Sequence, residues 1–347
     1  SSGLGIVFQN YFFFLLPLIV LFAGITVYRL HWIFYILLFS IPFSTELDLP
    51  GGFSTDFPDE PIMWWLFCFG LLYVLTTRSE DLKNWMRHPL TWAILIHWVW
   101  IFYTSIVSQD MIASMKFWLA KTWYLVVFYL LAFLFLKTYK RLLAFSVFSI
   151  VAAVITVVVI EFRHAASGFA FDQINTVVRP FYRNHVNYAC LLVCLLPYSW
   201  PVWHYLKRDQ FKRVIWTGVI LILLCGIFLS YTRAAYLAIF GIVLIYPLLK
   251  WRLVHAAAVV VPVVVLIGLS YFISNNRYLE FAPDYNKAIT HYEFGSLLEA
   301  TPQGKDISTM ERVYRWVAGA NMVGERYLVG FGPAGFYGAY QPYTLNQ

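Results

Sequence analysis

The sequence predicts an all-α, polytopic integral membrane protein with about ten transmembrane helices, and three observations support this fold class. Of the 347 residues, 61% are hydrophobic and only 12% are charged, whereas soluble domains carry about 25% charged residues. The apolar residues gather in long runs, and a bilayer span needs about 20 of them. The chain also contains 14 Trp, 24 Tyr and 31 Phe, and Trp and Tyr are enriched at membrane–water interfaces.

Ten apolar runs are candidate spans, of which the second, third and ninth are short: 5–28, 30–44, 61–77, 89–107, 117–136, 142–162, 186–206, 213–231, 234–249 and 253–273. As one helix, residues 214–249 would extend about 54 Å, whereas the hydrocarbon core is about 30 Å thick. This stretch therefore holds two spans, and we expect the chain to turn at Ser230–Tyr236, which reads SYTRAAY.

Loop charge predicts the orientation of these spans. One set of alternate loops holds 13 basic residues, from Arg29 through to Arg252, and the short loops on the other side hold six, including Arg233. The positive-inside rule places the richer side in the cytoplasm. Arg233, the 162–185 loop and the tail from Ser274 should then face outward. The net charge of +7 is thus accounted for by membrane topology, and we expect no nucleic-acid partner.

A change in composition at Ser274 predicts two domains. Residues 1–273 form the transmembrane domain, and 274–347 form one large outward loop domain that is truncated at its C-terminal end. A polar segment of this length between spans is typical of a functional domain or lid. The four cysteines lie inside apolar runs, which indicates small buried residues. No leader with a cleavage site precedes the first run, and both ends read as the ends of a longer protein.

Arginines on the expected outer side are the candidate ligand-binding residues. Arg233 is the only charged residue between Val214 and Leu249, and an arginine at mid-bilayer costs at least about 2.5–3.5 kcal/mol. Arg179 and Arg183 flank Pro180, which can occupy the first position of a helix and would set the arginines one turn apart. Guanidinium groups bind phosphate oxygens bidentately, so these positions predict an anionic ligand, with interfacial snorkelling as the alternative.

The outward tail adds a second set of candidates. The pattern Ser308-Thr-Met-Glu311 is a capping box that predicts a helix from about Thr309, with Arg312 and Trp316 on one face. A turn-rich loop, Gly330–Gly335, then permits close approach to a ligand. His185 is better interpreted as a hydrogen-bonded histidine at a helix start than as a base. The outer acids Asp48, Asp56, Asp59 and Glu60 are interpreted as solvating a loop, and no metal site or cofactor is expected.

Three stretches together resemble the O-antigen ligase and polymerase family of membrane glycosyltransferases. They are FYRNHVNYACLLVCLLP (181–197), LSYTRAAYLA (229–238) and ERVYRW with GFGPAGF (311–336). The resemblance covers roughly residues 140–347. It implies many helices, one large periplasmic loop late in the chain, and a location in the bacterial inner membrane with the active site facing the periplasm.

The resemblance also implies a reaction and roles for residues. Members of the family transfer a glycan from an undecaprenyl-diphosphate carrier to a lipid or glycan acceptor, as in lipopolysaccharide biosynthesis, without a nucleotide sugar and without an obligatory metal. Arg233 matches the arginine of the family's S-R-G-A-like helix start, although Ala234 replaces the glycine, and Arg312 matches the arginine four residues before a tryptophan. Both would hold the diphosphate. The family's catalytic histidine is expected beyond Gln347, so the catalytic residue is not assigned.

Several alternatives remain open at this stage. An O-antigen ligase, a polysaccharide polymerase and a protein O-oligosaccharyltransferase share the donor and differ in the acceptor. A non-enzymatic transporter or flippase of an anionic lipid-linked glycan would also use outward arginines, but it predicts an internal repeat and broken helices near mid-bilayer. The sequence shows neither, which favours the transferase.

Overall fold

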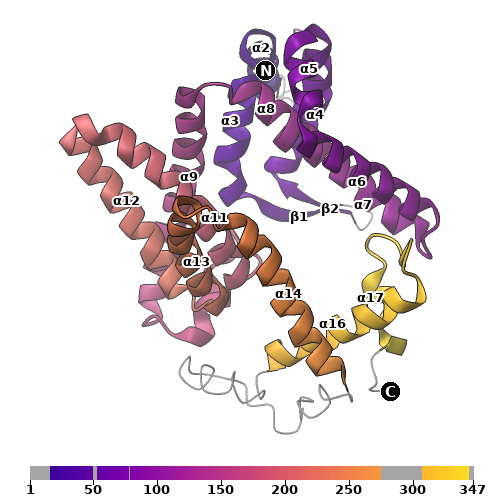
Figure 1. Cartoon of the computed structure of the whole chain (residues 1–347). Helices are drawn as coiled ribbons and strands as arrows, with labels where there is room; N and C mark the ends of the chain where they lie inside the picture. The colour runs from indigo at the N-terminus through magenta and orange to yellow at the C-terminus, as the bar shows by residue number, and fades with distance from the viewer. Residues whose placement is uncertain (1–15, 50–52, 78, 275–306, 344–347) are drawn as a thin grey trace. The chain divides into compact units, whose positions relative to one another are not determined.

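The computed structural model describes residues 16–49, 53–77, 79–274 and 307–343 (Figure 1). Most of these residues are helical, which confirms the predicted fold class. Seven helices in this part of the chain are long and apolar enough to cross a membrane, or up to eight if a bent helix pair is one span. The seven are Pro89–Ile106, Met111–Phe135, Tyr139–Ala166, His185–Arg208, Gln210–Leu229, Arg233–Lys250 and Val254–Tyr271. The total of ten spans stays a prediction.

The chain folds into two compact units, each assembled from separate stretches. The first comprises Ser1–Thr91, Thr122–Gly168 and Asn175–Ser230, and the second comprises Trp92–Lys121, Phe169–Ile174 and Tyr231–Gln347. The boundary expected at residue 273 concerns which part of the chain lies in the membrane, and it stays a prediction.

The first unit has an apolar core formed by residues 30–38, 62–66 and 127–135. Its elements are α2 (Leu16–Arg29), α3 (His31–Ser40), η2 (Ile41–Phe43), α4 (Asp59–Thr76), α5 (Ser79–Arg87), the π-helical η3 (Val126–Leu131) and α8 (Ala132–Phe135). Ile33, Leu66 and Leu131 are fully buried there. A Cβ at Gly70 of α4 would lie 2.5 Å from the Leu131 side chain, so the glycine permits this close approach.

Three long helices of the first unit pack against one another: α9 (Tyr139–Ala166), α11 (His185–Tyr205) and α12 (Gln210–Leu229). Each begins at a side chain that accepts a hydrogen bond from the first turn, namely Thr138, Asn184 and Asp209. Such caps satisfy backbone N–H groups that have no partner within the helix. The short elements η4 (Phe171–Gln173), α10 (Ile174–Val177) and η5 (Leu206–Arg208) connect the long helices.

A β-hairpin is the one sheet among the described residues, and the sequence interpretation as a simple loop was wrong there. Strands β1 (Thr45–Leu49) and β2 (Phe53–Phe57) pair antiparallel, with Glu46 opposite Asp56. The signal was present in the sequence. Apolar residues recur at even spacing on either side of a Pro-Gly-Gly stretch, at Leu47, Leu49, Phe53 and Phe57, and such a pattern is typical of a hairpin.

The second unit contains most of α6 (Pro89–Ile106), the first part of α7 (Met111–Leu125), α13 (Arg233–Lys250), α14 (Val254–Ile273), α16 (Ile307–Glu325), α17 (Phe336–Ala339) and η7 (Gln341–Tyr343). The turn expected in SYTRAAY is confirmed, because α12 ends at Leu229 and α13 begins at Arg233. The predicted tail helix is confirmed as α16, which begins two residues before Thr309. The side chain of Ser308, and with it the expected cap, lies outside the described side chains.

Candidate functional site

A cavity of about 680 Å³ lies in the first unit, where the β1–β2 hairpin meets the segment before α11. Its lining combines carboxylates, two guanidinium groups, aromatic rings and an amide. The lining residues are Ile41, Ser44, Thr45, Glu46, Asp56, Asp59, Arg179, Pro180, Phe181, Tyr182, Arg183 and Asn187. The fold thus brings together Arg179 and Arg183, two of the predicted site residues.

The local structure around these arginines differs from the expectation. Pro180 does not open a helix, because it lies in a turn over residues 178–181 and α11 begins only at His185. The Arg179–Pro180 peptide is cis, and the Arg179 carbonyl accepts a hydrogen bond from the Arg163 guanidinium. Arg183 Nη2 lies 3.0 Å from Glu46 Oε2 in an exposed ion pair, and such pairs contribute little to stability.

Carboxylates balance the arginines in this cavity. Glu46, Asp56 and Asp59 line it together with Arg179 and Arg183, so Asp56 and Asp59 do more than solvate a loop. Burial, and then the nearby Glu60 carboxylate, raises the pKa of Asp56 above its ordinary value, although Arg183 opposes this shift. Carboxylates accept hydrogen bonds from hydroxyl groups but repel phosphate oxygens. This balance does not favour a diphosphate here, and a substrate-binding role for Arg179 and Arg183 stays a prediction.

His185 is the hydrogen-bonded histidine at a helix start that the sequence predicts. It is the first residue of α11, and its Nδ1 lies 2.8 Å from Asn175 Oδ1, which also accepts the His185 backbone N–H over 3.1 Å. The ring is thereby held by its own helix start, and no catalytic role is needed to explain it.

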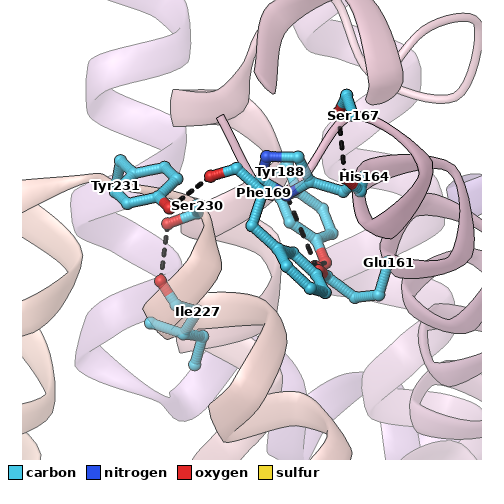
Figure 2. Close-up of polar contacts among 8 residues, drawn as sticks. All are labelled: Glu161, His164, Ser167, Phe169, Tyr188, Ile227, Ser230 and Tyr231. Atoms are coloured by element: carbon cyan, nitrogen blue, oxygen red, sulfur yellow. Dashed lines mark hydrogen bonds and ion pairs between the residues drawn. The ribbon is translucent and has the colours of Figure 1, made fainter. Parts of the chain in front are cut away.

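Sequence reasoning missed a carboxylate inside an apolar helix, and Figure 2 shows it. Glu161 of α9 accepts a hydrogen bond of 3.1 Å from the Tyr188 hydroxyl of α11. The fully buried His164 has its Nδ1 3.8 Å from Glu161 Oε2. The signal available was Glu161 itself, the only charged residue between Arg141 and Arg163. Ionisable groups within spans mark functional sites by default.

Helix α12 makes room for the Tyr188 hydroxyl. A Cβ at Gly226 would lie 2.6 Å from Tyr188 Oη and 2.9 Å from Val157 Cγ1. Glycine at this position therefore lets α9, α11 and α12 converge on the buried tyrosine, as small residues commonly do at helix contacts in membranes.

The SYTRAAY turn places Arg233 at the start of α13. Tyr231 adopts a φ of +52°, and its hydroxyl donates a hydrogen bond of 2.7 Å to the Phe169 carbonyl (Figure 2). Its ring also meets Phe171 edge-on at 5.5 Å between centroids. Arg233 is the first residue of α13 and is half-buried. Because a helix N-terminus carries partial positive charge, a cation there is unfavourable unless an anion lies near both.

Helix α16 carries Arg312 on its exposed face. Arg312 and Trp316 are both exposed, whereas Tyr314, Val317 and Ala318 are buried. Glu311 pairs with Arg315 over 3.1 Å, an i,i+4 contact on the helix surface. Arg233 and Arg312 belong to the same compact unit. Their convergence on one cavity, and their role in substrate binding, stay predictions.

The glycine-rich loop after α16 has a left-handed backbone at three positions. The φ angles are +60° at Gly330, +87° at Gly332 and +62° at Ala334. Left-handed conformations suit glycine because it has no Cβ. Two of the loop's carbonyl oxygens accept hydrogen bonds from Ser108, in the α6–α7 turn, and from Ser114, at the start of α7. The loop is therefore held in place by residues far away in the sequence.

Comparison with known proteins finds a match for the part of the chain that contains Arg233, Arg312 and the glycine-rich loop. Residues 218–347 match the family model described as O-antigen ligase. This part of the chain is similar to the O-antigen ligase family. The resemblance seen in the sequence is thereby confirmed over residues 218–347, and the family is one of enzymes, ligases or polymerases that act on lipid-linked glycans in a membrane. No curated protein and no solved structure matches the chain significantly.

The O-antigen ligase match divides the candidate residues. Arg233, Arg312 and the 330–335 loop lie inside it. The cavity with Arg179 and Arg183, the half-buried Glu161 and the two serines that contact the loop lie outside it. The first group therefore combines the family match with the local geometry, and the second group rests on geometry alone.

Proposed function

We propose that the protein is an O-antigen ligase-type glycosyltransferase of the bacterial inner membrane. Its donor is a glycan linked to undecaprenyl diphosphate, and its acceptor is a lipid or glycan presented at the periplasmic face. The observation that carries this proposal is the O-antigen ligase match over residues 218–347, which contains both candidate diphosphate-binding arginines and the glycine-rich loop.

The proposed chemistry is displacement at the sugar carbon that is bonded to the diphosphate. The acceptor hydroxyl oxygen forms the new bond to that carbon, and the old bond to the diphosphate oxygen breaks. The leaving diphosphate keeps the electron pair, and a base takes the hydroxyl proton. The family resemblance implies that this base is a histidine.

Arg233 and Arg312 stabilise the negative charge that develops on the leaving diphosphate. Guanidinium groups remain charged at any relevant pH and bind phosphate oxygens with two parallel hydrogen bonds. Fixed positive groups aimed at developing charge are commonly the largest contribution to such catalysis. The partial positive charge at the start of α13 adds to the Arg233 guanidinium.

The test is glycan transfer from a purified carrier-linked donor by the full-length protein. Arg233→Ala and Arg312→Ala should each lower the rate at least about a hundredfold. Arg233→Lys should recover only part of it, because lysine lacks the planar fork. Arg208→Ala is the matched control, since Arg208 is an exposed arginine of η5 outside the candidate site. Wild-type rates in both alanine variants would rule the proposed roles out.

The acceptor distinguishes the members of the family. A ligase joins the glycan to lipid A-core, a polymerase joins it to a second carrier-linked chain, and a third type joins it to protein. We favour the ligase because the matched family model bears that description. Parallel assays with each acceptor decide between the three. Movement of labelled donor across a vesicle membrane without transfer to any acceptor would instead support a flippase.

A further inference from the structure

Two serines near the α6–α7 turn hold the glycine-rich loop. Ser108 Oγ donates a hydrogen bond of 3.2 Å to the Phe331 carbonyl, and Ser114 Oγ donates one of 2.7 Å to the Pro333 carbonyl. The two hydroxyl oxygens lie 2.7 Å apart. The first contact joins residues that are 223 positions apart in the chain, and the second joins residues that are 219 positions apart. All four residues belong to the second compact unit.

Steric fit reinforces these hydrogen bonds at Gly332. A Cβ at this position would overlap Ser108 Oγ and Cβ and would lie 3.1 Å from Ser114 Oγ. The φ of +87° also disfavours any other residue. At Gly335 a Cβ would lie 2.5 Å from the Phe331 carbonyl oxygen. The loop thus lies directly against the serines with no room for a side chain at Gly332.

The serines are themselves fixed by the helices around them. Ser114 is fully buried, and its backbone carbonyl accepts a hydrogen bond of 3.2 Å from Ser105 Oγ of α6. Asp110 Oδ1 accepts the Ala113 N–H over 2.9 Å and closes the first turn of α7. The Trp118 ring of α7 packs on Phe102 of α6 with centroids 4.7 Å apart. The hydroxyl groups are therefore presented by a rigid element.

We infer that Ser108 and Ser114 are positioning residues that fix the Gly330–Gly335 loop for glycan transfer. The inference rests on the proposed function and deepens it, because the loop lies in the matched region with Arg233 and Arg312 and its glycines permit close approach to the carrier diphosphate. Each serine hydroxyl has one proton to donate, and Ser114 Oγ lies within donating distance of both Ser108 Oγ and the Pro333 carbonyl. Removing either hydroxyl leaves one proton for two loop carbonyls, so at least one carbonyl loses its donor. The loop then samples other conformations, and the groups that face the diphosphate lose their alignment.

Transfer kinetics of the full-length protein test the role in the reaction. Ser114→Ala should lower kcat about tenfold, and Gly332→Ala about a hundredfold, with the KM for the acceptor unchanged in both. Adding Ser108→Gly to Gly332→Ala removes the atoms that the new Cβ would overlap, and this double variant should recover about tenfold. Gln109→Ala and Gly338→Ala are matched controls, since Gln109 is exposed in the same turn and nothing lies within 4 Å of a Cβ at Gly338.

Hydrogen exchange of the detergent-solubilised protein tests the contact independently of activity. The Gly330 N–H donates to the Arg326 carbonyl over 2.9 Å and the Gly335 N–H to the Gly332 carbonyl over 3.1 Å, so both amides are protected. Ser114→Ala should speed exchange in peptides covering 326–336, and Gln109→Ala should not. Unchanged exchange, or faster exchange with wild-type kcat, overturns the inference and leaves the proposed function standing. A wild-type protein without transfer activity overturns the proposed function, while the exchange data still decide the contact.

Discussion

Tyr188 of α11 donates a hydrogen bond of 3.1 Å to the Glu161 carboxylate of α9. The tyrosine is fully buried, and the glutamate side chain is only 16% exposed. Among the described residues, Glu161 Oε2 has no hydrogen-bond partner, so the tyrosine hydroxyl is the principal stabilising contact of this carboxyl group. A polar group withdrawn from water is costly unless it is hydrogen-bonded. The hydrogen bond between Tyr188 and Glu161 therefore stabilises the packing of α9 against α11.

Removing the tyrosine hydroxyl should destabilise the protein. Tyr188→Phe leaves Glu161 Oε1 without its donor, which should cost about 1–3 kcal/mol of the free energy of unfolding. Thermal unfolding in detergent measures the effect. Tyr198→Phe is the matched control in the same helix, because the Tyr198 side chain is 41% exposed. Equal melting temperatures for the two variants would contradict the role given to the Tyr188 hydroxyl.

Two glycines of α12 should respond in opposite ways to alanine. Gly226→Ala would bring a methyl group to 2.6 Å from Tyr188 Oη, and such overpacking should cost about 1–3 kcal/mol. Nothing lies within 4 Å of a Cβ at Gly218. Gly218→Ala should be neutral or slightly stabilising, since alanine is the better helix former. The melting temperatures of the two variants in one detergent make the comparison, and a stable Gly226→Ala variant would refute the close approach.

Stability of the β-hairpin should depend on the charge of Asp56. Its partner across the strands is Glu46, and like charges directly opposite are unfavourable by about 0.2–1 kcal/mol. The pKa of Asp56 is raised in the folded protein by burial and by Glu60. The folded state therefore holds this proton more tightly than the unfolded state does, and stability falls as pH rises from the ordinary aspartate range through the raised pKa.

Asp56→Asn should accordingly stabilise the protein at neutral pH, and the gain should shrink as the pH falls through the raised pKa of Asp56. Melting temperatures of both proteins across that pH range measure the difference. Thr45→Val controls for a change in the partner strand that carries no charge. A gain that is constant with pH would show that the charge of Asp56 is not its source.

Cysteine labelling should reveal the orientation of the tail. Tyr327 follows α16 and is 77% exposed, and the 13-to-6 asymmetry of basic residues between the loops predicts that it faces the periplasm. In a background without the four native cysteines, Tyr327→Cys should react with a membrane-impermeant maleimide in intact spheroplasts. Lys207→Cys, expected in the cytoplasm, should react only after lysis. The reverse pattern would invert the topology.

Local signals were sufficient for the helices and for three features of the candidate site. The apolar runs predicted the long helices, and the length of the 214–249 run predicted the turn before Arg233. The helix that carries Arg312 followed from a four-residue pattern within its first turns. His185 at a helix start was also predicted. Each of these features depends on residues that are close together in the sequence, where periodicity and capping act directly.

Contacts between distant parts of the chain could not be predicted in this way. Tyr188 reaches Glu161 because α9 and α11 pack together, and no pattern in either helix specifies that pairing. Ser114 and Pro333 are separated by 219 residues, and serines near a turn are ordinarily interpreted as solvated. The β1–β2 hairpin is a different case. The even spacing of its apolar residues was visible in the sequence, but the Pro-Gly-Gly stretch between them was interpreted only as a loop.

The serine contacts also bear on how the enzyme can be recombined with its relatives. The O-antigen ligase match begins at residue 218, yet its glycine-rich loop is held by Ser108 and Ser114. A chimera that exchanges only the matched region joins a loop shaped for one turn to the α6–α7 turn of another protein. Grafts that aim to change acceptor preference should therefore carry the α6–α7 turn together with the C-terminal region, and natural recombination within that boundary should be selected against for the same reason.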